Sequence, residues 1–87
     1  MERIQDSERV LKALANRRRL AILRYLHKKG FANVSDIAAE IKLSFKATSK
    51  HLSVLSAANV VEKEQVSLMM NYRLTKPTHP VLTILLQ

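Results

Sequence analysis

Residues 34–55, VSDIAAEIKLSFKATSKHLSVL, decide the fold of this chain. The apolar residues of this stretch recur at helical spacing on both sides of a short break at Ile41-Lys42-Leu43. Ser35 and Ser44 are placed to begin the two helices, because a serine hydroxyl accepts a hydrogen bond from a backbone N–H that the first turn leaves free. The stretch therefore predicts two short helices joined by a tight turn.

The second of these helices, residues 44–58, has one face suited to packing and one suited to DNA. Thr48, Leu52 and Leu55 repeat as i, i+4 and i+7 and are expected to pack inward. The opposite face is polar and basic and carries no carboxylate, as a helix lying in a DNA major groove requires. We expect this helix to contact DNA through Ser44, Phe45, Lys46, Ser49, Lys50, His51 and Ser53.

Composition favours a small domain with a polyanionic partner. The 87 residues are enough for one domain, residues 1–87, and 47% of them are hydrophobic. A net charge of +8 favours nucleic acid, although a ribosomal-type protein, or basicity that serves only solubility, would also fit it. The chain has no cysteine, no apolar run approaching the roughly 20 residues of a membrane span, and a polar start unlike a signal peptide. We expect a cytoplasmic protein that needs no membrane.

The flanking segments complete a mainly α fold with a small β-hairpin. Two helices are expected before the central stretch, at residues 6–15 and 17–29, with Asn16 as a cap and Gly30 as a stop. Asn59 ends the fourth helix, and Pro80 precedes a last helix at residues 81–87. The order of helix, helix, helix, helix, hairpin and helix predicts a winged helix-turn-helix.

The hairpin, or wing, is expected to form from strands at residues 60–63 and 68–74. The second strand alternates in its side chains with the period of two that a strand requires, and residues 64–67 would form the tip. We expect the wing to meet phosphates or the minor groove through Lys63, Gln65, Ser67 and Arg73.

Two segments of the chain resemble those of ArsR-type (arsenic-repressor-type) transcriptional regulators. LKALANRRRLAILRYL (residues 11–26) is similar to the opening of that family, and SDIAAEIKLSFKATSKHLSVL (residues 35–55) is similar to its DNA-reading unit. The pair Val60-Val61 and the closing NYRL (residues 71–74) resemble the family's wing. The resemblance implies a homodimeric DNA-binding regulator, commonly a repressor, with a dimer interface made by the first and last helices.

The last helix supports the same expectation, because its apolar residues surround the helix, so one face can pack on its own domain and the other on a partner. A two-fold dimer predicts a two-fold symmetric DNA site. The expected interface residues are Ile4, Val10, Leu11, Leu14, Val81, Leu82, Leu85 and Leu86.

The sequence departs from the family pattern in three places. Lys42 stands in the break where the family usually has glycine; a positive φ there would cost about 1 kcal/mol relative to glycine. The wing tip also lacks glycine. The cysteine pair of metal-sensing members would fall around residues 33–35 and is missing, and the last helix has only His79 before it, so we expect no metal and no other cofactor.

Several interpretations remain open from the sequence alone. The run Arg17-Arg18-Arg19 is either a solvated face or supplies one contact to the DNA backbone, although the family arginine matched by Arg19 is usually structural. Phe45 either touches a thymine methyl or folds back onto Ile41 or Leu43. Catalysis is not expected, because no nucleophile turn accompanies the serines and histidines.

The main alternative function is a winged-helix module for protein–protein interaction, since a fold does not fix a function. An RNA-binding role is less favoured because the four Phe and Tyr residues form no stacking platform.

Overall fold

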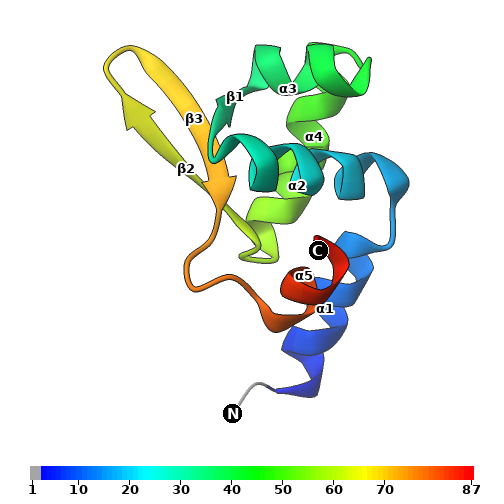
Figure 1. Ribbon diagram of the computed structural model, residues 1–87. Coiled ribbons are helices and arrows are strands. Elements are labelled where there is room, and N and C mark those ends of the chain that lie inside the picture. The colour runs from blue at the N-terminus through cyan, green and yellow to red at the C-terminus, as the bar shows by residue number, and fades with distance from the viewer. Residues whose placement is uncertain (1–2) are drawn as a thin grey trace.

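The computed structural model describes residues 3–87 and confirms the predicted winged helix-turn-helix. Four helices precede a β-hairpin, and one short helix follows it (Figure 1). The sheet also includes a short strand between the second and third helices, which the sequence did not predict. The elements are α1 (Ile4–Leu14), α2 (Arg17–Lys29), β1 (Ala32–Asn33), α3 (Val34–Ile41), α4 (Phe45–Ala57), β2 (Val61–Val66), β3 (Met69–Leu74) and α5 (Pro80–Leu85).

The hydrophobic core receives side chains from all five of these helices and lies where α2 crosses α4 (Figure 1). Thr48, Leu52 and Leu55 of α4 are fully buried, as the helical period predicted. Fully burying a leucine contributes about 1.5–3 kcal/mol, so this one stripe fixes the rotation of α4 about its axis. The other fully buried large side chains are Ile22, Leu23, Leu26, Ile37, Val60, Val61 and Leu82.

Side-chain caps begin the three central helices. The Asn16 side chain accepts hydrogen bonds from the backbone N–H groups of Arg18 and Arg19, at 2.9 and 3.0 Å. Ser44 Oγ accepts from the N–H of Ala47 at 3.1 Å, as predicted. The prediction that Ser35 begins α3 was wrong, because Asn33 Oδ1 accepts from the N–H of Asp36 and starts that helix two residues earlier.

The wing is longer and its tip tighter than the sequence predicted. Backbone pairing continues through Gln65–Met70 and Val66–Met69, in a sheet of order β1-β3-β2. The predicted tip at residues 64–67 was therefore wrong, and the turn consists of Ser67 and Leu68. Ser67 has φ 58°, the positive value that a two-residue hairpin turn demands and that glycine usually provides.

The break between α3 and α4 is held in a strained but hydrogen-bonded conformation. Lys42 has φ 56° and ψ 51°, in the left-handed region. The N–H of Leu43 donates to the carbonyl of Ala38 at 3.0 Å, and Arg18 Nη1 donates to the carbonyl of Ile41 at 3.3 Å. These bonds satisfy carbonyls at the end of α3 and set the direction in which α4 departs.

Arg19 joins three helices. Its guanidinium donates to the carbonyls of Ala13 and Lys12 at the end of α1, the second at 3.3 Å. Its Nη1 also lies 3.3 Å from Nδ1 of His51 on α4. Burial and the charges of Arg19 and Arg18 lower the pKa of His51 below 6.5, so a neutral ring that accepts from Arg19 is favoured. This contact ties the helix-turn-helix to α1.

Lys42→Gly is expected to raise the free energy of unfolding by about 0.5–1 kcal/mol, because glycine adopts a positive φ without the clash of a Cβ atom. Urea denaturation of the wild-type and variant proteins measures the change. Lys42→Ala is the matched control, since it removes the charged chain and keeps the Cβ atom. Equal stability of the glycine and alanine variants would contradict strain at this residue.

The contribution of His51 to stability should be complete above pH 6.5 and should be lost as the pH falls toward its lower folded-state pKa. A histidine whose pKa is depressed by folding binds its proton more readily in the unfolded chain, so acid favours unfolding. His51→Gln keeps a hydrogen-bond acceptor that does not titrate and should lose this part of the pH dependence. Denaturation curves between pH 7.5 and 5.5 for both proteins test it; parallel pH profiles would refute it.

Candidate nucleic-acid interface

The outward face of α4 is polar, basic and exposed. Lys46, Lys50 and Ser53 lie within about 60° of one another around the helix, opposite the buried stripe. All three are exposed, and within residues 3–87 neither lysine forms an ion pair. Ser49 is half-buried at the edge of this face. The face offers two free cations and a hydroxyl to a groove lined by phosphates and base edges.

The first turn of α4 projects an aromatic ring. Phe45 is 59% exposed, so it is not part of the core. Its ring is therefore accessible for the contact with a thymine methyl, which is one of the two interpretations that the sequence left open. Ser44 uses its hydroxyl oxygen to accept from the N–H of Ala47 and so fixes the start of the helix. An exposed phenylalanine beside Lys46 gives this turn both apolar and cationic contact groups.

His51 lies on the flank of α4 that faces α1 and α2. Its ring is half-buried against Arg19, so His51 has a packing contact within the protein, whereas the sequence suggested a contact with DNA. The Arg19 guanidinium is used in the same way, as the family resemblance implied. Arg19 and His51 therefore stabilise the position of α4 from the side that faces α1 and α2.

The wing presents two faces of different charge. Its register places Lys63 and Gln65 on one face, with Tyr72 and Met70 opposite them. Lys63 is exposed and forms no ion pair in the described chain, and Gln65 Nε2 donates to the carbonyl of Ser67 at the tip, at 3.4 Å. This face of the wing is the one that keeps a free cation.

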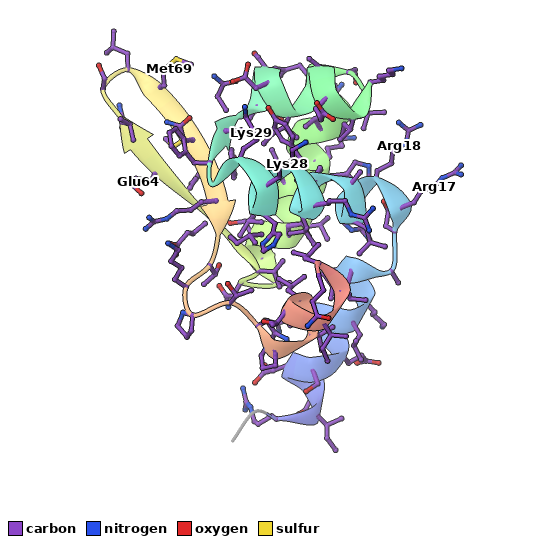
Figure 2. All side chains as sticks on the ribbon, viewed as in Figure 1. Arg17, Arg18, Lys28, Lys29, Glu64 and Met69 are labelled. Carbon is purple, nitrogen blue, oxygen red and sulfur yellow. The ribbon has the colours of Figure 1, made fainter. Side chains whose placement is uncertain are left out.

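The opposite face of the wing corrects the expectation for Arg73. Its Nε lies 3.0 Å from a carboxylate oxygen of Glu62, and its Nη1 lies 3.4 Å from one of Glu64. Glu64 extends from the edge of the hairpin in Figure 2. Two carboxylates offset the guanidinium charge, so Arg73 is not the free phosphate ligand that the sequence suggested. The strand register brings these groups together, and residue spacing alone did not reveal it.

The three consecutive arginines at the start of α2 have separate positions. Arg19 points inward, Arg18 binds the carbonyl of Ile41, and Arg17 is exposed without an ion pair or a side-chain hydrogen bond among the described residues. Figure 2 shows Arg17 and Arg18 extending from the same end of α2. Of these three arginines, only Arg17 is therefore a solvent-exposed side chain without a contact among the described residues.

The terminal helices α1 and α5, which overlap in the view of Figure 1, both expose apolar side chains. Ile4 is 86% exposed, Leu11 54% and Leu85 44%, and Ile84, which the expected set omitted, is 71% exposed. The expected interface set also includes four residues that are buried in the core of this domain, and for these the expectation was wrong: Val10, Leu14, Leu82 and Leu86. Val81 is half-buried against that core, and its place in the interface stays a prediction.

The described residues provide neither a metal cluster nor a membrane-spanning element. Within residues 3–87, no three His, Cys, Asp or Glu side chains gather closely enough to hold a metal ion. None of the helices in that range combines the length and apolar character needed to cross a bilayer.

Comparison with known proteins agrees with this geometry. The family described as "Bacterial regulatory protein, arsR family" matches residues 16–63, which run from the cap of α2 to the first half of the wing. No curated protein sequence matches the chain.

Solved structures match over nearly the whole chain. The homodimeric winged helix-turn-helix domain of Mb0332 from Mycobacterium bovis, a possible ArsR-family regulator, is 30% identical with a TM-score of 0.84, over 94% of this chain and 73% of that one. The transcriptional repressor PagR of Bacillus anthracis is 28% identical with a TM-score of 0.82, over 94% and 91%. HlyU from Vibrio cholerae is 29% identical with a TM-score of 0.81, over 98% and 90%.

The family match covers more than half of the chain and includes the helix-turn-helix whose outward face is described above. The chain therefore belongs to the arsR family of bacterial regulatory proteins and is a winged helix-turn-helix, DNA-binding transcriptional regulator.

Proposed function

We propose that this protein is a homodimeric repressor that binds a specific, two-fold symmetric DNA site. The observation that carries the proposal is the outward face of α4, where Lys46 and Lys50 are exposed without ion pairs and no carboxylate interrupts them. A helix of this kind enters the major groove, where side chains reach base edges. The whole of residues 1–87 serves as one DNA-binding domain that acts on DNA in the cytoplasm.

Each side chain of the interface has a distinct role in this proposal. Phe45, Lys46, Ser49 and Lys50 read base edges, while Ser53 lies near the backbone. Lys63, with Gln65 and Ser67 at the wing tip, neutralises or contacts the backbone beside the major groove. Repression needs no catalysis, since a bound dimer occludes a promoter, and the proposal includes no metal or other cofactor.

Dimerisation uses the exposed apolar side chains of α1 and α5. Ile4, Leu11, Ile84 and Leu85 are exposed on the first and last helices, where a second copy would remove them from water. The homodimeric state of the Mycobacterium bovis domain supports this arrangement. Two copies of α4 related by a two-fold axis then read two half-sites of opposite orientation.

Lys46→Ala and Lys50→Ala should each cost about 1–3 kcal/mol of binding to the selected DNA site and much less on random duplex, if these lysines read guanines. Lys63→Ala should instead weaken binding to all sequences about equally, because it removes only a phosphate contact. Lys28→Ala removes an exposed lysine of α2. It is the matched control and should change the affinity for neither duplex. Fluorescence anisotropy measures binding to both duplexes. If Lys46→Ala and Lys50→Ala weakened binding to the selected and the random duplex equally, base reading by these lysines would be contradicted.

A salt titration of the intact protein tests DNA binding as such. Several phosphate contacts per subunit should make affinity fall steeply between about 50 and 200 mM salt, since bound cations release counterions from DNA. Lys63→Ala should reduce the slope of log K against log salt by roughly one for each arm of the dimer. A flat titration would instead support the protein-interaction module.

Leu85→Glu should produce monomers that bind DNA weakly, because a carboxylate placed in an apolar interface loses its water without gaining a partner. Leu68→Glu is the matched control: Leu68 is 93% exposed at the wing tip and should leave the dimer intact. Sedimentation velocity at micromolar protein distinguishes the two. A wild-type protein that sediments as a monomer at that concentration would overturn the proposed dimer.

A further inference from the structure

A second basic surface lies on α2, away from the proposed DNA contacts. Arg17, Arg24 and Lys28 are exposed and fall within about 40° of one another around the helix, on the side opposite its buried residues Ile22 and Leu26. None of the three cations forms an ion pair within residues 3–87. We call these three residues the α2 stripe.

The stability of α2 explains only part of this charge. The helix sequence RRRLAILRYLHKK has six Arg or Lys residues and no Asp or Glu. Arg18 and Arg19 make contacts within the protein, and Lys28 and Lys29 stand in the last turn, where the helix dipole favours cations. Arg17, however, stands in the first turn, where the dipole disfavours a cation. Arg24 and Lys28 are four residues apart, a spacing at which like charges repel. An anionic partner would relieve both unfavourable terms.

A groove of about 610 Å³ runs beside the α2 stripe, between α2 and α3. It is open to solvent, and its lining combines the cations with apolar surface from half-buried Leu20, Tyr25 and Ile41. Glu40 of α3 is its only carboxylate among the described residues. The stripe extends about 16 Å along α2, because its ends are eleven residues apart. Figure 2 shows Arg17 and Lys28 toward opposite ends of the helix.

The groove and the proposed DNA-reading face lie on different sides of the protein. α2 packs on α4 through its buried side, and α2 passes in front of α4 in Figure 1. The α2 stripe faces away from that contact, while Lys46 and Lys50 face away from it on the other side.

We propose that this groove binds an acidic, amphipathic segment of a partner protein while the regulator is on DNA. Carboxylates at intervals along such a segment pair with the α2 stripe, and its apolar residues cover Leu20, Tyr25 and Ile41. A nucleic-acid backbone fits this lining less well, because it offers nothing to the apolar half. A span of about 16 Å matches about three turns of helix. This inference goes beyond repression by occlusion, since it adds a protein contact.

The test uses the full chain and a fluorescent 16-residue peptide built from Glu and Leu, with the leucines on one helical face. A second peptide has Gln in place of every Glu, and a third keeps the composition but scatters the leucines. Arg17→Gln, Arg24→Gln and Lys28→Gln are combined in one variant, which keeps helix-forming side chains at exposed positions and should fold. Arg9→Gln combined with Lys12→Gln, on exposed residues of α1, is the control for bulk charge.

The wild-type protein should bind the amphipathic acidic peptide about tenfold more tightly than either other peptide, both free and bound to a selected duplex. The triple variant should lose about tenfold in peptide affinity, with less than twofold change in duplex affinity, and the α1 control should bind the peptide as wild type does. Equal peptide binding by the triple variant and the wild type, or an equal loss in the α1 control and the triple variant, would overturn the proposal. Displacement of the peptide by duplex would do the same, because it would make the groove a second nucleic-acid surface.

Discussion

The burial of one stripe of α4 against α2 determines what the rest of the molecule can do. Thr48, Leu52 and Leu55 are removed from water, and each leucine contributes about 1.5–3 kcal/mol. A rotation of α4 about its axis would expose that stripe, so Lys46 and Lys50 are held outward by apolar packing rather than by any contact of their own. The direction of the helix is then set by the left-handed Lys42 before its start and by the contact of His51 with Arg19.

The distribution of charge follows from this packing. The net charge of +8 is not spread evenly, since α4 and α2 carry unpaired cations on different sides of the protein. The wing is close to neutral, because Glu62 and Glu64 pair with Arg73 and, among the described residues, only Lys63 keeps a free charge on its two long strands. DNA affinity in this protein should therefore depend more on α4 than on the wing. The unpaired cations on α2 are those that we propose to bind a separate anionic partner.

The sequence predicted the parts of the structure that depend on neighbouring residues. The stripe of α4 and the caps at Asn16 and Ser44 follow from a period of 3.6 residues and from local hydrogen bonds. The exposed position of Phe45 was one of two alternatives that the sequence left open. The family usually has glycine where Lys42 stands, and for that reason a positive φ was considered at this residue. The structure confirms the positive φ.

The errors arose where distant parts of the chain meet. No glycine marked the turn at Ser67, so the wing was predicted too short, and the partner of the two-residue strand β1 lies about 40 residues away in β3. The pairing of Arg73 with Glu62 depends on strand register, which alternation alone does not fix. In the terminal helices the apolar residues were identified, but their division between core and surface needed the fold: Leu82 is fully buried while Ile84 is exposed.

Selection of bound sequences from a random duplex pool, followed by footprinting on the enriched site, tests the central claim most directly. If a two-fold dimer places α4 of each protomer in a major groove, the enriched sequence will contain two inverted half-sites. Their centres will be about 10–10.5 bp apart, or a multiple of that distance, and both will be protected. Failure to enrich any sequence, or an asymmetric site protected over one half only, would contradict the account.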